Sequence, residues 1–317
     1  MRAFVVLLGV ALAGSQFGEQ HVILDNLSNF PVHIAAAFLV CAVILAIARC
    51  SRWAFVSAVG LAVSLVPVVP WYFSSDADTV GGDGAVAKLL VSNVYLQNRQ
   101  YERLARLIDE ERPDIVGLLE VNSRWLDELP ALRRDFPYRL EAPDQVFVGL
   151  ALYSKLPLAD PRIVRFGEFA TPAIVATIQM PDGAFEIILT HTLPPMNTGL
   201  ANRRNSQLHE LSRYARASKR PVLLAGDLNV TMWNRNYRSL ARHGRLRNAR
   251  EGHGVAPSWP PLRAFGIPID HIMATAPLQL RSFRVHRSIG SDHLPISAEF
   301  SLAAQDTGML QEGGSPR

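Results

Sequence analysis

The stretch from Pro221 to Val230 constrains the fold most, because it joins a buried strand to a pair of polar side chains. Its sequence is Pro-Val-Leu-Leu-Ala-Gly-Asp-Leu-Asn-Val, and apolar runs without a polar break are typical of strands covered on both faces. A period of two places Asp227 and Asn229 on the same side of the strand end, with Leu228 turned toward the core. A helical segment, 231–243, follows. Such strand-to-helix loops commonly carry the functional groups of α/β enzymes.

Polar residues also stand at or beside the ends of other predicted strands. These strands are 88–95, 115–119, 147–153, 163–166, 173–180, 184–190, 267–274 and 296–302, and helices are predicted at 99–111, 124–136 and 200–217. The polar residues are Asn93, Glu120, His191, Asp270, Asp292 and His293. Each alone fits an ordinary turn former or a hydrogen-bonded structural residue. The preference of such residues for turns does not explain why several strand ends all carry side chains that can ligate a metal ion or transfer a proton.

The N-terminal quarter of the chain is strongly apolar. Residues 30–48 and 53–73 form uncharged runs of about 19 and about 21 residues, each long enough as a helix to cross a hydrocarbon core of roughly 30 Å. Residues 3–14 form a shorter apolar run, read either as a first membrane helix or as a cleaved signal segment. The alternative for the two long runs is a buried helical hairpin of a soluble core. We therefore predict a membrane anchor over residues 1–73 with two or three transmembrane helices.

The basic residues of the anchor predict its orientation. Arg49 and Arg52 lie between the two long runs, whereas residues 15–29 contain no Lys or Arg. The positive-inside rule places this turn in the cytoplasm, and one crossing later everything after Phe73 lies outside. A polar, glycine-rich stretch at 74–86 is predicted to be a flexible tether, and the tail 303–317 is predicted to be disordered. A catalytic domain is predicted between them, over residues 87–302.

Arginines gather in two segments of the predicted domain, although the net charge of the chain is only +4. They are Arg203, Arg204, Arg213 and Arg216, and then Arg235, Arg238, Arg242, Arg245, Arg247 and Arg250. Solvated helix faces and an anion-attracting surface are both open interpretations. A basic stripe with interleaved aromatic residues, which would indicate a nucleic-acid track, is not evident in the sequence.

Six sequence blocks resemble those of the endonuclease/exonuclease/phosphatase superfamily, whose members have a DNase I-like fold. The blocks are Ser92-Asn93-Val94, Leu118-Leu119-Glu120-Val121, Thr190-His191, Gly226-Asp227-Leu228-Asn229, Ile269-Asp270-His271-Ile272 and Gly290-Ser291-Asp292-His293-Leu294-Pro295. The combination of Gly-Asp-x-Asn with a later Ser-Asp-His-x-Pro is specific. The anchor followed by such a domain is also similar to a bacterial membrane subgroup that includes glycopeptide-resistance-associated proteins. The implied fold class is α/β, a four-layer sandwich of two mixed β-sheets with outer helices.

The resemblance also implies roles for individual residues. Glu120, Asn93 and Asp292 correspond to the metal ligands, and Asp227 with Asn229 to the pair that orients the attacking water and the phosphate. His293 corresponds to the general base or phosphate-contacting histidine with Asp270 as its partner, and His191 to the second histidine of the DNase I and sphingomyelinase branches.

The residue types are consistent with this chemistry independently of the family. The three metal-side residues are all oxygen donors, which Mg²⁺ or Mn²⁺ prefers and which argue against zinc. A histidine held by a carboxylate can move a proton or stabilise developing charge near neutral pH. We therefore predict a Mg²⁺-dependent phosphoric ester hydrolase.

The substrate is less constrained. Tyr95 stands where some apurinic-site nucleases carry a second metal-side Asp, and Trp259 and Leu262 could form an apolar wall beside the phosphate. With the anchor, these features favour a phosphate ester or pyrophosphate of a membrane lipid or cell-wall lipid carrier, outside the cytoplasm. The alternatives are an extracytoplasmic nuclease acting on DNA or RNA, and a catalytically dead, tethered binding protein.

Overall fold

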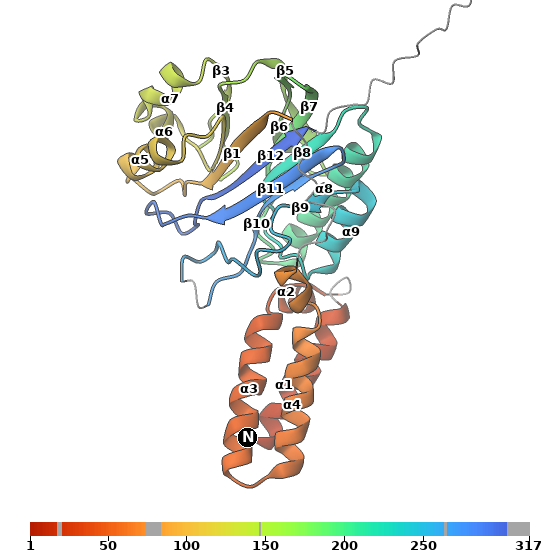
Figure 1. Cartoon of the computed structure of the whole chain (residues 1–317). Helices are drawn as coiled ribbons and strands as arrows, with labels where there is room; N and C mark the ends of the chain where they lie inside the picture. The colour runs from red at the N-terminus through yellow and green to blue at the C-terminus, as the bar shows by residue number, and fades with distance from the viewer. Residues whose placement is uncertain (18–20, 74–83, 146, 263–264, 303–317) are drawn as a thin grey trace, which may run out of the picture.

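Two facing β-sheets form the larger part of the molecule, and a helical stalk projects from them (Figure 1). The structure is a computed structural model that describes residues 1–17, 21–73, 84–145, 147–262 and 265–302. The predicted tail, 303–317, and most of the predicted tether, 74–83, lie outside the described residues. Whether these two segments are flexible therefore stays a prediction.

The first sheet has six strands and mixed pairing. Its order is β11 (Leu278–Val285), β12 (Ile296–Leu302), β1 (Val86–Asn93), β2 (Ile115–Leu119), β4 (Leu150–Ser154) and β3 (Tyr138–Ala142). Strands β1 and β2 are parallel, because the chain returns through helix α5 (Tyr101–Glu111) between them. The carboxyl ends of β1 and β2 therefore meet at one edge of the sheet, where Asn93 and Glu120 lie.

The second sheet repeats this plan. Its order is β5 (Leu158–Phe166), β6 (Thr171–Met180), β7 (Gly183–His191), β8 (Val222–Asp227), β10 (Asp270–Ala274) and β9 (Arg247–Asn248). Strands β7 and β8 are parallel and are connected by helix α8 (Thr198–Ala217), and their register pairs His191 with Asp227. The antiparallel strand β10 begins opposite them, with Asp270 paired to Asp227.

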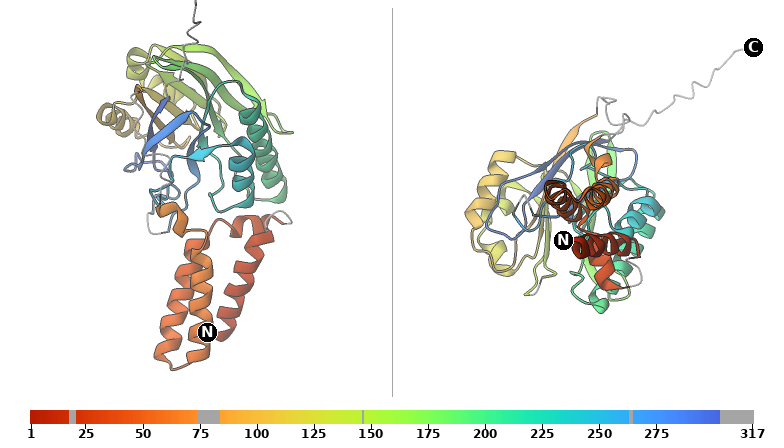
Figure 2. Two further views of the ribbon diagram at one scale, coloured as in Figure 1. Left: turned by 45° about the vertical axis from the view of Figure 1, so that its right-hand side comes forward. Right: turned by 90° about the horizontal axis from the view of Figure 1, so that it is seen from below.

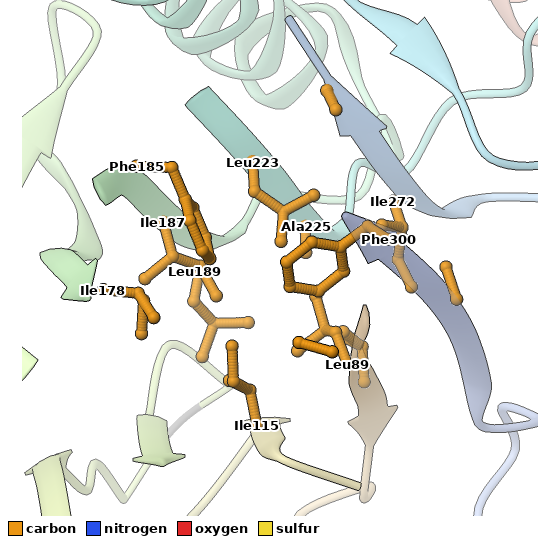
Figure 3. Close-up of a cluster of buried hydrophobic side chains, with 14 of the residues drawn as sticks. Leu89, Ile115, Ile178, Phe185, Ile187, Leu189, Leu223, Ala225, Ile272 and Phe300 are labelled. Carbon is orange, nitrogen blue, oxygen red and sulfur yellow. The ribbon is translucent and has the colours of Figure 1, made fainter. Parts of the chain in front are cut away.

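Aliphatic and aromatic side chains from both sheets fill the space between them (Figure 3). Leu89 and Ile115 come from the first sheet and face Phe185 and Leu223 of the second, all fully buried. The sheets approach closely at Gly117, where a Cβ atom would lie 2.6 Å from the Cδ1 atom of Leu189. Helices α5, α6 (Ser123–Asp127) and α7 (Pro130–Asp135) cover the first sheet, and α8 and α9 (Arg235–Gly244) cover the second. The predicted sandwich of two mixed sheets with outer helices is confirmed.

Several predicted element bounds were wrong for local reasons. The predicted helix 124–136 is two helices, because Pro130 begins a new one, and the Asn122 side chain caps the first by accepting from the Trp125 amide. Helix α9 begins at Arg235, later than predicted, because the Asn234 side chain caps it by accepting from the Asn236 amide. Strands β3, β9 and β11 were not predicted.

The stalk consists of three apolar helices with a short connecting helix. These are α1 (Arg2–Gly14), α3 (Pro31–Ile47) and α4 (Ser51–Leu65), with α2 (Val22–Leu27) beside the sheet domain and the 3₁₀ segments η1 (Ser15–Phe17) and η2 (Val69–Tyr72). Figure 2 shows the three long helices side by side below the sheets. The turn that carries Arg49 and Arg52 lies at the far end of the stalk from the sheet domain.

The predicted transmembrane helices are shorter than expected. Helix α3 has 17 residues where 30–48 was predicted, and α4 has 15 residues where 53–73 was predicted. Pro67 and Pro70 follow α4, and a proline does not continue an α-helix, so the chain turns into η2 instead. Among the residues that the structure describes, none of the helices is both long enough and apolar enough to traverse a membrane.

Candidate active site

The rim where the parallel strands of both sheets end carries a cluster of polar side chains. Asn93 is the last residue of β1, Glu120 follows β2, and His191 and Asp227 are the last residues of β7 and β8. Each sheet therefore supplies two adjacent strand ends. The two crossover helices, α5 and α8, make the strands parallel and so bring these four residues to one place.

Asp227 lies at the centre of the cluster and is 1% exposed. Its Oδ2 atom is 3.3 Å from the Nδ2 atom of Asn93, 3.3 Å from Nε2 of His191 and 3.5 Å from Nε2 of His293. Burial alone would raise the pKa of Asp227, but the two histidines outweigh it and hold the pKa below its ordinary value. The side chain is therefore a carboxylate at neutral pH.

Glu120 and Asn93 form a second contact within the cluster. The Nδ2 atom of Asn93 donates to Oε1 of Glu120 at 2.8 Å, and Oε2 of Glu120 accepts from the Leu96 amide at 3.3 Å. Glu120 has a φ of 59°, a left-handed conformation that is uncommon for a residue with a long side chain. Backbone strain of this kind is typical of functional sites, where the surrounding contacts hold it.

His293 and Asp270 join the two sheets at the rim. The Nδ1 atom of His293 lies 2.9 Å from Oδ2 of Asp270, and both side chains are buried. Burial lowers the pKa of His293, but Asp270 and Asp227 raise it more, to about 10. His293 is therefore a cation at neutral pH in the absence of a metal ion. A charged imidazole suits contact with a phosphate or donation of a proton better than it suits a general base.

His191 has a fixed orientation. Its Nδ1 atom lies 2.7 Å from the carbonyl oxygen of Phe147, so Nδ1 donates there and Nε2 faces Asp227 at 3.3 Å and Glu120 at 4.0 Å. Burial lowers the pKa of His191, and the carboxylate of Asp227 reverses this and leaves the pKa raised. The second predicted histidine thus lies in direct contact with the acidic cluster.

Asn229 completes the cluster from the loop after β8. Its amide donates to Oδ1 of Asp227 at 2.8 Å, and its side chain donates to the carbonyl of Thr192 at 2.8 Å and lies 3.4 Å from His191. The φ of Asn229 is 47°, so its backbone is also left-handed. Neighbouring groups therefore fix both the backbone and the side chain of this residue.

Asp292 has different neighbours from those predicted. Its carboxylate accepts from the Trp259 indole at 3.4 Å and from the Ser291 hydroxyl at 3.4 Å. The Ser291 hydroxyl also donates to the backbone carbonyl of Asn93 at 2.8 Å, which ties the 291–293 loop to the end of β1. Direct contact of Asp292 with Asn93 or Glu120 is not observed among the described residues. Its assignment as a metal ligand stays a prediction.

The donor set fits a divalent cation. Ligand-type atoms of Asp227, Asp270 and His293 all lie within 4.8 Å of one another, but a protonated His293 has no lone pair for an ion, so the two carboxylates are the donors in this trio. Beside them, Glu120 offers further oxygen atoms, and its Oε2 is engaged by one long backbone contact alone among the described residues. Asn93 turns its Nδ2 atom toward Glu120 and Asp227, and its Oδ1 atom accepts from the Tyr95 amide at 3.1 Å. Hard oxygen donors suit Mg²⁺ or Mn²⁺, and the acidic groups supply the charge that such an ion needs. Glu120 and Asp227 are the residues best placed to hold it, and Asn93 would join them with its amide turned over.

Of the supporting residues around the rim, the sequence indicated Trp259 as a neighbour of the phosphate, but it gave no such role to Ser258 or Arg250. The Ser258 hydroxyl accepts from the Asp270 amide at 3.2 Å, and the Trp259 ring centroid lies 6.3 Å from that of His293. Arg250 is fully buried and donates through Nη2 to the Asp270 carbonyl at 2.7 Å. These residues are far from the motifs in sequence or lie in a proline-rich loop, so spacing gives no signal for them.

The sequence left open whether the clustered arginines lie on solvated helix faces or form an anion-attracting surface. Two of them do not lie on solvated faces. Arg204 and Arg250 are both 0% exposed. Arg204 occupies the buried face of α8 that also carries Ala201, Leu208 and Leu211, at the three- and four-residue spacing of a core stripe. That spacing was a signal in the sequence that Arg204 is buried. Burial lowers the pKa of Arg204, an effect that Asp25 opposes.

Several solved structures share the fold of this chain. TDP2 from D. rerio, solved with a single-strand DNA product, is 14% identical, with a TM-score of 0.57 over 68% of this chain and 99% of that one. An endonuclease/exonuclease/phosphatase from Beutenbergia cavernae DSM 12333 is 18% identical, with a TM-score of 0.55 over 69% of this chain and 72% of that one. A family protein from Bacteroides thetaiotaomicron is 16% identical, with a TM-score of 0.56 over 70% and 97%. At these identities the likeness establishes a shared fold.

Comparison of the sequence with curated proteins found no match. The model of the endonuclease/exonuclease/phosphatase family matches residues 90–293, a range that contains every residue of the cluster described above. The sequence blocks, the two-sheet fold and the polar rim thus lead to the same conclusion: the chain belongs to the endonuclease/exonuclease/phosphatase family.

Proposed function

We propose that this chain is a Mg²⁺- or Mn²⁺-dependent phosphoric ester hydrolase that acts on a phosphate ester or pyrophosphate of a membrane lipid or cell-wall lipid carrier. The family takes its name from endonucleases, exonucleases and phosphatases, which all cleave phosphate esters. The observation that carries the proposal is the position of Asp227, whose Oδ2 atom lies within 3.5 Å of Asn93, His191 and His293. Two strand ends and the loop before β12 thus bring their polar groups to the carboxylate at the end of β8.

The residues of the rim have distinct tasks in this proposal. A cation held by Glu120, Asn93 and Asp227 supplies charge neutralisation at the phosphate when it is bound. Asp227 and Asn229 accept from and orient the attacking water. His293, positively charged and fixed by Asp270, stabilises the negative charge that develops on the phosphoryl oxygens.

The proposed membrane attachment rests on the outer surface of the stalk. Apolar side chains on its three helices are exposed, among them Leu7 at 63%, Ile47 at 78% and Phe55 at 71%. An exposed apolar surface that extends along a whole bundle needs a cover, and a bilayer supplies one. We propose that residues 1–73 anchor the enzyme in the cytoplasmic membrane of a bacterium, as in the subgroup that it resembles.

The proposed lipid substrate is supported by the loop beside the rim. Trp259 of this loop contacts Asp292 and faces His293, and Leu262 and Phe265 are 63% and 69% exposed. The carbonyl of Phe265 lies 2.9 Å from Nε2 of His33 on α3 of the stalk. The loop therefore links the candidate active site to the apolar stalk, which is where the chain of a lipid phosphate would need to run.

A substrate panel tests the proposal. The purified full chain in detergent micelles is given Mg²⁺ with a polyprenyl phosphate, a polyprenyl pyrophosphate, a phospholipid, and single- and double-stranded DNA. We expect turnover of one of the lipids and slow cleavage of DNA. Rapid DNA cleavage without lipid turnover would replace the lipid assignment by a nuclease.

A variant in the apolar loop sharpens this experiment. Leu262→Ser should raise KM for the lipid and leave the hydrolysis of a small soluble phosphodiester unchanged, because the small ester does not reach the apolar loop. Ile163→Ser is the matched control, since Ile163 is 48% exposed on β5 and should change neither value. Equal KM values for wild type and Leu262→Ser would remove this loop from lipid recognition.

The side of the membrane is also a proposal. Arg49 and Arg52 at the far end of the stalk favour a cytoplasmic turn, which would put the catalytic domain outside. A C-terminal reporter that is active only outside the cytoplasm should therefore be active. Activity of a cytoplasm-specific reporter alone would reverse the orientation.

A nuclease is the second candidate, and one observation favours it. Helices α8 and α9 form a hollow of about 600 Å³ that is lined by His209, Ser212, Arg213, Arg216, Arg242 and His243. This lining carries positive and neutral groups, which suit a polyanion. In the substrate panel a nuclease would show DNA cleavage that weakens steeply as the salt concentration rises.

A further inference from the structure

The N-terminal segment does more than connect the stalk to the sheets, because helix α2 contacts the loop that carries Asn229. Helix α2 lies between the stalk and the sheet domain (Figure 1). Its Asp25 side chain is 2% exposed, although it is a carboxylate. A buried carboxylate is costly unless a cation and hydrogen bonds compensate its charge. The partners of Asp25 therefore indicate what this segment does.

The cationic partner of Asp25 is Arg204 on α8, which is fully buried. The Nη2 atom of Arg204 lies 2.5 Å from Oδ2 of Asp25, and its Nη1 atom donates to the backbone carbonyl of Asn229 at 3.0 Å. One guanidinium group thus joins the N-terminal segment to the candidate catalytic asparagine. Arginine suits this bridge because its planar fork presents donors in fixed directions.

Further hydrogen bonds join the same two segments. The Asn29 Oδ1 atom accepts from the amide of Thr231 at 2.9 Å and from its hydroxyl at 3.0 Å. The Asn234 side chain donates to Oδ1 of Asp25 at 2.9 Å and to the hydroxyl of Ser28 at 2.8 Å. All five side chains are nine-tenths or more buried. Residues 25–29 therefore determine the path of the chain just after Asn229.

Asn229 has an uncommon backbone conformation that its neighbours hold. Its φ of 47° lies in the left-handed region, which asparagine adopts more readily than most residues but less readily than glycine. Asp227 holds its amide, Thr192 holds its side chain, and Arg204 holds its carbonyl. Loss of the Arg204 contact would let the peptide rotate, and the side chain of Asn229 would move with it.

We propose that Asp25 and Arg204 are positioning residues of the active site, and that the N-terminal segment 25–29 completes the site by holding Asn229 in its working geometry. This proposal rests on the proposed hydrolase activity only for its assay. If the wild-type chain hydrolyses none of the panel substrates, the proposed function fails. If the wild-type chain is active and the variants below behave normally, the positioning proposal fails alone.

Asp25→Asn is the first test, because it keeps the shape and removes the charge that holds Arg204. A misplaced catalytic group lowers the rate of the chemical step more than it weakens substrate binding. We expect kcat of the folded full-length variant to fall by about 10- to 100-fold and KM to change by less than about threefold. Asp160→Asn is the matched control, because Asp160 pairs with Arg162 at 2.7 Å but is exposed, and it should match wild type.

Combination with Asn229→Ala separates positioning from general loss of stability. If Asp25 acts through Asn229, Asp25→Asn should lower kcat in the wild-type background and have little further effect once Asn229 is alanine. If segment 25–29 merely attaches the stalk, the fold-losses of kcat caused by Asp25→Asn and by Asn229→Ala should multiply in the double variant. Multiplied losses, or kcat of Asp25→Asn within about twofold of wild type, would overturn the proposal.

Asn29→Ala gives an independent test if Asp25→Asn does not fold. This change leaves the Asp25–Arg204 pair intact and removes the two contacts to Thr231. We expect a smaller fall in kcat, about three- to tenfold, which again disappears in the Asn229→Ala background. Full kcat in a folded Asn29→Ala variant would then overturn the proposal.

Discussion

The Nδ1 atom of His293 lies 2.9 Å from the Oδ2 atom of Asp270, and this pair connects β10 of the second sheet to the loop that enters β12 of the first. The Nε2 atom of the same imidazole faces Asp227 at 3.5 Å. The histidine therefore stands between two carboxylates, and their charges decide its protonation state.

The first prediction concerns the pH dependence of the rate. Because Asp270 and Asp227 raise the pKa of His293 above its ordinary value, a rate that needs the imidazolium is lost only as the pH rises past neutral. Asp270→Asn removes a charge that raises this pKa, so the basic limb of kcat/KM against pH should move to lower pH. Profiles of wild type and variant between pH 6 and pH 11 measure the shift. A basic limb that does not move would contradict the role of Asp270.

The second prediction concerns Glu120. Glu120→Ala should reduce hydrolysis at least 1000-fold with little effect on folding, because charge neutralisation at the phosphate is worth several kcal/mol. Rates with saturating Mg²⁺ and circular dichroism spectra measure the two effects. Glu128→Ala is the control, since Glu128 is exposed and should retain full activity. Near wild-type rates for Glu120→Ala would show that the ion is held elsewhere.

The third prediction concerns the metal. A chelator should abolish hydrolysis, and Mg²⁺ or Mn²⁺ should restore it better than Zn²⁺, because the donors at the rim are mainly oxygens. Calorimetric titration of the chelated chain should show binding of Mn²⁺ that Glu120→Ala weakens by at least tenfold. Hydrolysis that persists after exhaustive chelation would rule out a metal-dependent reaction.

The fourth prediction concerns stability against pH. Burial lowers the pKa of His271 to about 3 and that of His286 to about 4, so both are neutral in the folded chain. The unfolded chain takes up protons at these residues below about pH 6.5. The stability change that comes from His271 and His286 should therefore be absent above that pH and should lower the stability as the pH drops toward 4 and then 3.

Denaturant midpoints at pH 7.5, 5.5 and 4.5 measure this dependence. His286→Gln should flatten the curve between pH 6.5 and pH 4, because it removes one of the two proton-binding residues. His253→Gln is the control, since His253 is exposed. Its denaturant midpoints should vary with pH as those of the wild type do. Identical curves for His286→Gln and wild type would show that His286 does not contribute.

The fifth prediction concerns the core between the sheets. Leu223 on β8 packs in that core and is 0% exposed to solvent. Leu223→Ala should therefore lower the free energy of unfolding by about 2–5 kcal/mol. Ile163→Ala on the outer strand β5 should cost about 1 kcal/mol or less. Urea unfolding compares the two, and equal losses would mean that Leu223 is not central to the core.

The sheets could be predicted where strands are buried. β2 and β8 are continuous apolar runs. Glu120 directly follows β2 and Asp227 is the last residue of β8, and an apolar run with a carboxylate at its end is recognisable from the sequence. β3 is exposed or partly exposed along its length and begins with Tyr138, so it has no clear alternation. β9 has two residues, too few for any periodic signal. Edge strands of this kind depend on their neighbours rather than on their own sequence.

The candidate site was predictable as a set of residue types but not as a set of contacts. Spacing indicated that Asp227 and Asn229 share one side, and the structure places both against His191. The link between Asp25 and Arg204 joins residues 179 positions apart, and no local pattern indicates such a pair. Sequence therefore identified the groups that gather at the rim better than the groups that hold them there.

The close approach of the sheets at Gly117 has a consequence for the evolution of this enzyme. Glu120 and Asn93 belong to one sheet and His191 and Asp227 to the other, so the distance between the two halves of the cluster depends on how the sheets pack behind it. A methyl group at Gly117 would meet the Cδ1 atom of Leu189 at 2.6 Å, and that side chain would have to take another rotamer. Hydrophobic positions that lie away from the rim, 117 and 189 among them, should therefore be selected together with the polar residues that they hold in place.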